Sequence, residues 1–284
     1  MKQATFRSDA RDFAALGQGT WKMGVDPDQA SKEISVLQEG LSKGLLVIDT
    51  AAMYADGGAE RIVARAVQGQ REKVFIVTKV WPTRADYRGV LQSLEESLGR
   101  LETDYVDLFL LHWPSARFPL ADTMRAMAEA QRKGLVRGVG VSNFSVELMA
   151  EASDALGDVP LVANQVEYSL AARDPETRII PYCQAHHVTV MAYSPIKNIN
   201  QLPPTHKGSA LLRELAERHA TTPQSIALAW TIRQAPVIAI PKSSSVPHLL
   251  SNIEALHVTL TSSELTALDR AFPPSGKDMA VERL

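Results

Sequence analysis

Strand-like and helix-like segments alternate along this 284-residue chain with a period of about 30 residues. Short apolar runs such as Val74–Val77 predict buried strands, and amphipathic stripes between them predict helices. Strands are expected to end near residues 49, 79, 112, 142, 165, 193 and 242, with a first strand near Leu16–Gly19. This is the spacing of right-handed βαβ units. Eight of them favour an α/β fold in which the sheet closes into a (β/α)8 TIM barrel.

Helix boundaries follow from capping residues and apolar stripes. Asp28 is expected to cap a helix that buries Ile34, Leu37 and Leu41 and that ends at Gly44. Two further stripes lie within 90–101 and 120–127. Later helices are expected over 57–69, 145–155, 174–186, 208–219, 223–234, 247–256 and 263–271.

Two segments fall outside the regular alternation. Residues 1–15 are expected to form a β-hairpin that closes the barrel floor. After the seventh strand, the long last interval leaves room for an inserted loop from Pro195 to Gly208 that contains Pro203 and Pro204. We expect one domain over 1–284, with its sites at the C-terminal face of the barrel.

Composition excludes several classes of partner. Hydrophobic residues make up 45% of the chain, and 30 Lys and Arg are mixed with 32 Asp and Glu at a pI near 6.4. That balance favours neither nucleic-acid nor membrane binding and points to small molecules. Cys183 is the only cysteine, so a reducing compartment is expected. With no apolar signal-like or membrane-spanning run, a cytoplasmic protein is expected.

Four polar residues stand at or just beyond the ends of consecutive expected strands, namely Asp49, Tyr54, Lys79 and His112. Each alone has an ordinary structural explanation, such as a strand-end turn for Asp49 or a hydrogen-bonded interior imidazole for His112. In a barrel, consecutive strand ends converge on one mouth. The joint occurrence of a carboxylate, a phenol, an ammonium and an imidazole there indicates an active site.

This set is suited to the reduction of a carbonyl group. A tyrosine has a pKa of about 10, and the ammonium of Lys79 is expected to lower the pKa of Tyr54 so that it acts as a general acid. Asp49 would hold Lys79 charged, and His112 could donate to the reacting oxygen. No metal-ligand cluster or activated nucleophile accompanies the set, so hydride from a nicotinamide fits best.

A metal site at Cys183, His186 and His187 is not predicted. These residues lie near the end of an expected helix, where histidines are common. One thiol with no third strong ligand does not make a typical zinc site.

The sequence resembles the aldo-keto reductase family, in collinear order from about residue 13 to 270. Within the family it is most similar to bacterial members that reduce methylglyoxal and other small aldehydes. The family pattern implies a barrel that binds a nicotinamide cofactor without a Rossmann domain, and residues 17–22 indeed lack the third glycine of G-x-G-x-x-G. The matching segments are Leu16–Trp21, Ile48–Ala51, Tyr54, Thr78–Lys79, Thr103–Leu108, Leu111–Pro114, Gly138–Phe144, Asn164–Gln165, Ala192–Pro195 and Ile240–Ser243.

The resemblance implies a role for each matching site residue. Tyr54 would be the proton donor, with Asp49, Lys79 and His112 as the other catalytic residues. The carboxamide and nicotinamide ring would contact Ser142, Asn143, Gln165 and Tyr193, and the pyrophosphate would lie along Ser194 and Pro195. The remaining cofactor contacts would be Gly19, Thr20, Trp21, Asp49, Lys242, Ser243, His248 and Asn252.

The segment from Lys242 to Ser245 precedes a helix with Pro247 in its first turn, and such helix N-termini bind phosphate. With the resemblance, Lys242 and Ser243 should hold the 2′-phosphate of NADPH. His248 replaces a frequent arginine of the family, and Ser251 replaces a frequent glutamate. We therefore expect NADPH to be preferred over NADH, though less strongly than in relatives that carry the arginine.

Aromatic residues near the strand ends are expected to wall the substrate pocket. These are Trp21, Trp81 and Trp113, together with Met23, next to Tyr54 and His112. Such walls suit small aldehydes and dicarbonyls but discriminate poorly among them. Trp230 lies in an apolar helical run and is expected to be scaffold.

Two other functions remain compatible with the sequence. One is a barrel enzyme of the aldolase kind that uses Lys79 as a Schiff base, and the other is a cofactor-sensing regulatory module. In each case the partner is a small molecule, with no nucleic acid or membrane. The chain is expected to be a monomer or a weak dimer.

Overall fold

The computed structural model of the chain describes residues 1–197, 199–203, 205–274 and 276–284. Pro204, which belongs to the expected inserted loop, lies outside the described residues. In its described part, the expected inserted loop lies between the seventh barrel strand, which ends at Tyr193, and the helix that begins at Lys207, and it contains a 3₁₀ turn at Ile199–Gln201.

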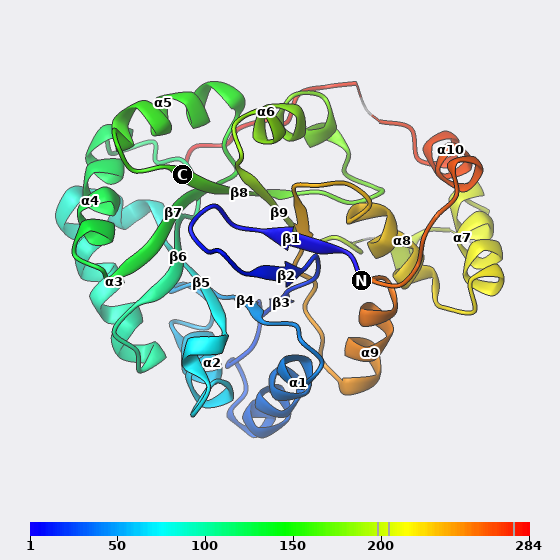
Figure 1. Cartoon of the computed structure of the whole chain (residues 1–284), viewed down its shortest axis with the longest axis horizontal. Coiled ribbons are helices and arrows are strands. Elements are labelled where there is room, and N and C mark those ends of the chain that lie inside the picture. The colour runs from blue at the N-terminus through cyan, green and yellow to red at the C-terminus, as the bar shows by residue number, and fades with distance from the viewer. Residues whose placement is uncertain (198, 204, 275) are drawn as a thin grey trace.

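In the described part of the chain, eight parallel strands pair in chain order (Figure 1). Parallel bridges from Leu16 to Ala239 and from Gly19 to Lys242 join the first and last strands. The sheet therefore closes, and the expected (β/α)8 barrel is confirmed. Its strands are β3 (Gln18–Gly19), β4 (Val47–Asp49), β5 (Phe75–Val80), β6 (Val106–Leu111), β7 (Val136–Ser142), β8 (Leu161–Glu167), β9 (Thr189–Tyr193) and β10 (Val237–Ala239).

Helices surround the barrel as an outer ring (Figure 1). They are α1 (Ala30–Ser42), α2 (Gly58–Ala66), α3 (Tyr87–Leu101), α4 (Leu120–Arg132), α5 (Val146–Leu156), α6 (Ile179–Ala185), α7 (Lys207–Arg218), α8 (Pro223–Thr231), α9 (Val246–Glu254) and α10 (Ser262–Ala271). Short 3₁₀ turns are η1 (Pro27–Gln29), η2 (Arg71–Lys73), η3 (Pro82–Arg84), η4 (Asp174–Glu176) and η5 (Ile199–Gln201). Both α7 and α8 lie between β9 and β10, which accounts for the long last interval.

Helix α3 shows how local sequence signals position these elements. Asp86 accepts a hydrogen bond from the backbone N–H of Gly89 and so caps the helix. A stripe that includes Val90, Leu94 and Leu98 is buried against β5 and the neighbouring helices. The helix ends at Glu102, which has a left-handed backbone conformation.

The expected cap of the first helix is wrong. Asp28 lies inside η1, and its backbone N–H donates to the side chain of Asp26, which is the residue that caps this turn. The reason is Pro27, whose fixed φ favours the first position of a helical turn. Helix α1 then begins at Ala30, and Gly44 ends it in a left-handed conformation with φ +86°, as expected.

The N-terminal hairpin is confirmed. Strands β1 (Gln3–Thr5) and β2 (Asp12–Ala14) are antiparallel, and in Figure 1 they cross the centre of the barrel. The ring of Phe6 stacks on that of Phe75, the first residue of β5, with centroids 4.3 Å apart. The hairpin thus covers the amino ends of the strands, and the carboxyl ends remain for a site.

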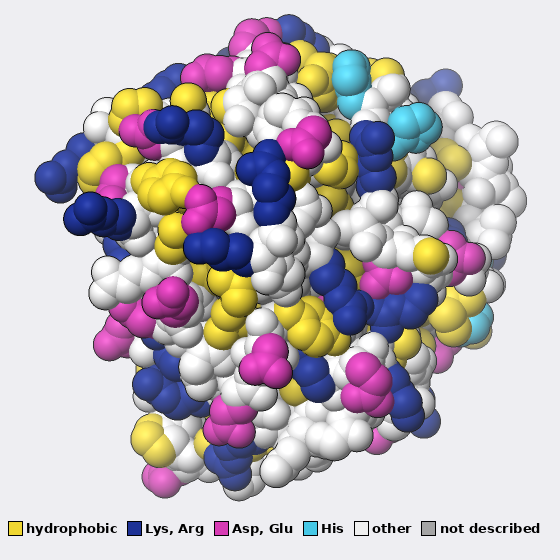
Figure 2. All heavy atoms as spheres, turned by 60° about the vertical axis from the view of Figure 1, so that its left-hand side comes forward, with side chains coloured by type: hydrophobic (Ala, Val, Ile, Leu, Met, Phe, Trp, Pro, Cys, Tyr) yellow, Lys and Arg dark blue, Asp and Glu magenta, His cyan; other side chains and the backbone are white. Residues whose placement is uncertain are grey.

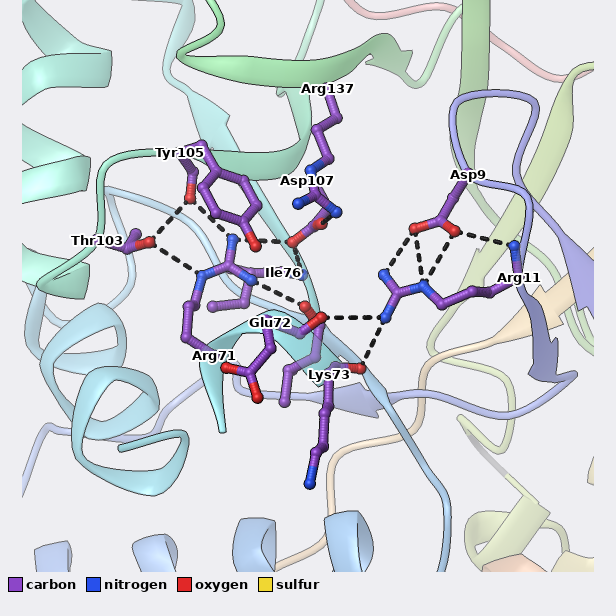
Figure 3. A network of polar contacts seen from close by, with 11 residues as sticks. Asp9, Arg11, Arg71, Glu72, Lys73, Ile76, Thr103, Tyr105, Asp107 and Arg137 are labelled. Atoms are coloured by element: carbon purple, nitrogen blue, oxygen red, sulfur yellow. Dashed lines mark hydrogen bonds and ion pairs between the residues drawn. The ribbon is translucent and has the colours of Figure 1, made fainter. Parts of the chain in front are cut away.

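A buried carboxylate joins several elements at the amino end of the barrel (Figure 3). Asp107 of β6 is fully buried and accepts from Arg71 at 2.8 Å, Arg137 at 3.2 Å and the N–H of Ile76 at 2.9 Å. The guanidinium carbons of both arginines lie 4.2 Å from the ring centroid of Tyr105. The network ties η2, β5, β6 and β7 together.

The surface carries both signs of charge. On the face shown in Figure 2, Lys and Arg side chains alternate with Asp and Glu. Pairs such as Arg132–Asp158, 2.6 Å apart, contribute to this mixture. Of the helices in the described part of the chain, none combines the length and apolar character that a membrane crossing requires.

Candidate active site

The four polar residues at the strand ends lie together at the carboxyl end of the barrel. The ammonium of Lys79 donates to Oδ2 of Asp49 at 2.8 Å and to the hydroxyl of Tyr54 at 3.3 Å. It also donates to the carbonyl oxygen of Thr50 at 2.8 Å. Lys79 is fully buried and Asp49 is 3% exposed, so the ion pair is shielded from solvent.

The strand period places Lys79 in this position. Successive side chains of a strand point to opposite faces, so Thr78 and Lys79 of β5 face away from each other. Thr78 donates to Glu60 of the outer helix α2 at 2.6 Å, and Lys79 therefore points into the barrel. Asp49 is the last residue of β4, whereas Tyr54 comes from the loop that follows.

His112, directly after β6, completes the group. Its ring lies edge-on to Tyr54 and Trp81, with centroid distances of 5.8 Å and 5.1 Å. Burial and then the charge of Lys79 lower the pKa of His112 to about 2. Its imidazole is therefore neutral near pH 7, and one ring nitrogen carries the only proton. The buried Nδ1 has no hydrogen-bond partner among the residues that the structure describes.

The pKa values of Tyr54 and Lys79 respond to burial and to each other. Burial raises the pKa of Tyr54 above its ordinary value, Lys79 opposes this rise and Asp49 adds to it. Lys79 acts to lower the pKa of Tyr54, as expected. The expected net lowering of this pKa is wrong, because the effect of burial is larger than that of Lys79. For Lys79, burial lowers the pKa, and Asp49 and Tyr54 more than compensate, so its pKa is raised.

A second polar group lies at the ends of β7, β8 and β9. Gln165 donates to Oδ1 of Asp49 at 2.7 Å, and Ser142 donates to the carbonyl of Gln165 at 2.9 Å. The amide of Asn143 donates to the carbonyl of His112 at 3.2 Å and accepts from the hydroxyl of Tyr193 at 3.0 Å. The bonds of Gln165 to Asp49 and of Asn143 to His112 join the two groups into one hydrogen-bonded network. Both amides are buried.

Two residues of the expected cofactor site have unusual backbone conformations. Asn143 has φ +63° and Ser194 has φ +52°, and non-glycine residues in this region are uncommon outside turns and functional sites. Ser194 and the buried Pro195 start the loop after β9. Thr20 is buried, and its hydroxyl donates to the carbonyl of Asp49 at 2.9 Å.

Residues expected to contact the nucleotide gather around the start of α9. The hydroxyl of Ser243 accepts from the side-chain amide of Asn252 at 3.0 Å. The backbone of Lys242 forms a parallel β-bridge with that of Gly19. The N-cap residue Ser245 makes no side-chain capping bond, so α9 keeps first-turn N–H groups that its cap does not satisfy. A small cavity beside them is lined by residues that include Gly17, Gly19, Pro241, Ser243 and Asn252.

The two residues that depart from the family pattern, His248 and Ser251, differ in exposure and contacts. His248 is exposed on α9. Ser251 exchanges a hydrogen bond with Thr222, the N-cap of α8, at 2.9 Å. The serine therefore ties α8 to α9.

The aromatic residues expected to wall the pocket differ in exposure. Trp21 is 59% exposed, and Trp81 and Trp113 are half-buried. The side chain of Met23 is only 1% exposed and packs with the core, where it lines the small cavity beside Gly19 and Ser243. Trp230 is fully buried, as expected for scaffold.

The sequence patterns missed two buried contacts around this site. The carbonyl of Thr50 accepts from Lys79, and Glu60 accepts from Thr78 and from Arg100. A backbone carbonyl leaves no signal in a sequence. Glu60 sits in the first turn of α2, which has an ordinary explanation in the helix dipole.

Cys183 does not take part in this site. It is buried on α6, and burial raises the pKa of its thiol to about 12, which makes it inert near neutrality. Among the described residues, there is no group of three or more His, Cys, Asp and Glu that could hold a metal ion.

Comparison with known proteins agrees with this architecture. Methylglyoxal reductase YeaE of Escherichia coli (strain K12) is 42% identical over 277 residues, which is 97% of this chain and 97% of that protein. A crystal structure of an aldo/keto reductase from Klebsiella pneumoniae with NADP and acetate superposes with a TM-score of 0.91 at 38% identity, covering 100% of this chain and 99% of the other. The structure of an aldo-keto reductase from Klebsiella pneumoniae with NADPH gives the same TM-score and identity and covers 100% of both chains. The sequence model of the aldo/keto reductase family matches residues 15–272, and the chain belongs to this family.

Proposed function

We propose that this protein reduces small aldehydes and 2-oxoaldehydes such as methylglyoxal to alcohols, with NADPH as the reductant. The observation that carries the proposal is the buried contact of Lys79 with both Asp49 and Tyr54. It places a phenol beside a permanent cation at the carboxyl end of a barrel, where the active sites of such folds lie. Membership of the family and similarity to a methylglyoxal reductase support the substrate class.

In this proposal Tyr54 is the general acid. Its hydroxyl proton passes to the carbonyl oxygen of the substrate as negative charge develops there. The phenolate left behind lies 3.3 Å from the ammonium of Lys79, which stabilises it. Asp49 keeps that ammonium charged and fixes its position.

His112 has a different role from Tyr54. Because burial keeps its imidazole neutral, it can donate one hydrogen bond to the carbonyl oxygen without adding a positive charge. A donor fixed in advance by packing against Trp81 stabilises developing charge without reorganisation. His112 would thus polarise the carbonyl while Tyr54 supplies the proton.

The residues present fit a nicotinamide cofactor. Buried amides and hydroxyls at the ends of β7 to β9 offer donors and acceptors for a carboxamide, namely Ser142, Asn143, Gln165 and Tyr193. The uncapped N-terminus of α9, with Lys242 and Ser243 before it, suits a phosphate. The bound cofactor would supply the hydride that the carbonyl carbon receives.

The state of Lys79 argues against the aldolase-like alternative. A Schiff base requires a neutral amine, which enzymes obtain by lowering the lysine pKa. Here the pKa of Lys79 is raised by Asp49, with which it forms a buried ion pair. Borohydride treatment in the presence of aldehyde should therefore leave Lys79 unlabelled.

The proposal is tested by following NADPH oxidation with a panel of aldehydes, ketones, dicarbonyls and sugars. We expect methylglyoxal and other small aldehydes to give the highest kcat/KM values, and NADH to replace NADPH less effectively. A purified, folded and NADPH-binding protein that oxidised NADPH with no member of the panel would contradict the proposal.

A further inference from the structure

The loop that carries Tyr54 has an unfavourable backbone conformation. Ala55, Asp56 and Gly57 follow Tyr54 directly and have φ values of +50°, +49° and +79°. Side chains with a Cβ disfavour this left-handed region, and three consecutive residues in it persist only where their surroundings hold them. The position of the Tyr54 hydroxyl therefore depends on what packs against this turn.

Arg100 of α3 covers the turn from one side. A Cβ atom at Gly57 would lie 2.3 Å from Cδ and 2.5 Å from Nε of Arg100, so the arginine stem lies directly against the glycine. The Nε of Arg100 donates to Oε2 of Glu60 at 2.5 Å. Glu60 is fully buried, whereas Arg100 is 19% exposed. This buried carboxylate fixes the direction of the guanidinium.

Glu60 also links the turn to the strand that carries Lys79. Its other oxygen, Oε1, accepts from the hydroxyl of Thr78 at 2.6 Å. Thr78 is the neighbour of Lys79 on β5 and faces the opposite side of the strand. One side chain therefore connects the position of the ammonium to the position of the turn that follows the phenol.

The turn also packs against backbone of another loop. Gly58 packs against Gly24. A Cβ atom added to Gly24 would lie 2.4 Å from the carbonyl carbon of Gly58. The N–H of Ala59 donates to the carbonyl of Tyr54 at 3.3 Å and joins the loop to the first turn of α2. The turn thus contacts both the loop after β3 and Arg100.

We propose that Glu60 and Arg100 are positioning residues, which hold the strained turn after Tyr54 so that its hydroxyl stays within reach of Lys79. This inference rests on the proposed role of Tyr54 as proton donor. Neither residue contacts the reacting atoms, so neither is catalytic in its own right. Buried ion pairs are weak evidence for stability, and fixing one local conformation is a role for which they are suited.

The test compares Arg100→Ala with Arg100→Lys in the full chain. Displacing a catalytic group by about 1 Å can cost roughly 100-fold in rate, so we expect kcat of Arg100→Ala to fall about 10- to 100-fold. KM for methylglyoxal and the Kd for NADPH should change little, because the variant leaves the contacts that bind substrate and cofactor in the ground state in place. Arg100→Lys keeps a stem over Gly57 and a cation for Glu60, and it should recover most of kcat.

Two further variants keep the test decisive. Glu60→Gln combined with Arg100→Ala removes both charges, and it replaces Arg100→Ala if the single variant leaves too unstable a protein. Arg218→Ala is the matched control, because Arg218 pairs at 3.1 Å with Glu264, another buried glutamate in the first turn of a helix, far along the chain from Tyr54. It should leave kcat unchanged.

All rates are expressed per NADPH-binding site, which removes the contribution of unfolded protein. Unchanged kcat in Arg100→Ala, or an equal fall in Arg218→Ala, would overturn the positioning role. Tyr54→Phe measured alongside separates the two proposals. If Tyr54→Phe keeps full activity, the proton-donor role fails. If Tyr54→Phe is inactive while Arg100→Ala is fully active, only the positioning role fails.

Discussion

The side-chain amide of Gln165 donates to Oδ1 of Asp49 at 2.7 Å, across 116 positions of sequence. The other oxygen of Asp49 accepts from Lys79 at 2.8 Å. The carboxylate is thus held from both sides of the barrel mouth, with one oxygen for the expected cofactor group and one for the catalytic group. Any change in Gln165 should therefore reach Lys79 through Asp49.

Removing the amide of Gln165 should affect cofactor binding and chemistry together. In Gln165→Leu, Asp49 loses a charge-assisted hydrogen bond, and such bonds contribute about 1.5–3 kcal/mol. We expect a weaker Kd for NADPH and a lower kcat, measured by fluorescence titration and steady-state rates. Gln70→Leu, at a half-buried position in the turn before η2, is the control and should change neither value. A change in Kd alone would show that Asp49 does not transmit the effect.

The neutral state of His112 predicts how stability depends on pH. In the unfolded chain a histidine takes up a proton below about pH 6.5, whereas folded His112, with a pKa of about 2, does not. The unfolded state therefore binds more protons, and the contribution of His112 lowers the free energy of unfolding as pH falls, by up to about 1.4 kcal/mol per pH unit. Urea denaturation between about pH 7 and pH 5 should show a smaller slope in His112→Gln.

Exposed His257 provides the control for that measurement. His257→Gln makes the same substitution at an exposed position outside the site, and its slope is measured under the same conditions. Identical slopes for His112→Gln and the unmodified protein would contradict the neutral buried imidazole.

The Asp107 network predicts a loss of stability without a loss of chemistry. Asp107→Asn removes the charged partner of Arg71 and Arg137, and loss of a charge-assisted hydrogen bond costs about 1.5–3 kcal/mol. Chemical denaturation should show this loss, while kcat per folded molecule stays unchanged because the network lies at the amino end of the barrel. Asp158→Asn, in an exposed pair with Arg132, should be nearly neutral. A large fall in kcat of Asp107→Asn would show that the two ends are coupled.

Lys242 should distinguish NADPH from NADH. Lys242 lies shortly before the N-terminus of α9 in the sequence, and we expect its ammonium to bind the 2′-phosphate there. Loss of a charge-assisted hydrogen bond of about 1.5–3 kcal/mol should raise the KM for NADPH roughly 10- to 100-fold in Lys242→Ala. The KM for NADH is the internal control and should be unchanged. Equal KM values for the two cofactors in the unmodified protein would refute this assignment.

The sequence predicted those features that depend on periodicity. Strands such as β5 and β6 are buried on both faces and read as continuous apolar runs, so their ends could be located to within two residues. Because barrel strands share one direction, their ends had to share one mouth. The proximity of Asp49, Lys79 and His112 follows from that geometry alone.

Features that depend on packing between distant segments were not predictable. The pairing of Glu60 with Arg100 joins two helices 40 residues apart and has no local signal. Met23 is buried in a loop whose next residue, Gly24, donates its N–H to Glu33 of α1. The burial of Tyr54 sets the direction of its pKa shift. Each of these is a property of the assembled barrel rather than of its segments.

The phenol of Tyr54 carries the central claim, and its removal is the most direct test. Tyr54→Phe keeps the ring packed against His112 and removes only the hydroxyl that lies 3.3 Å from Lys79. Loss of a general acid should lower kcat for methylglyoxal by roughly 100- to 10,000-fold, while the Kd for NADPH stays unchanged. A Tyr54→Phe protein that binds NADPH and reduces methylglyoxal at the rate of the unmodified protein would contradict the account.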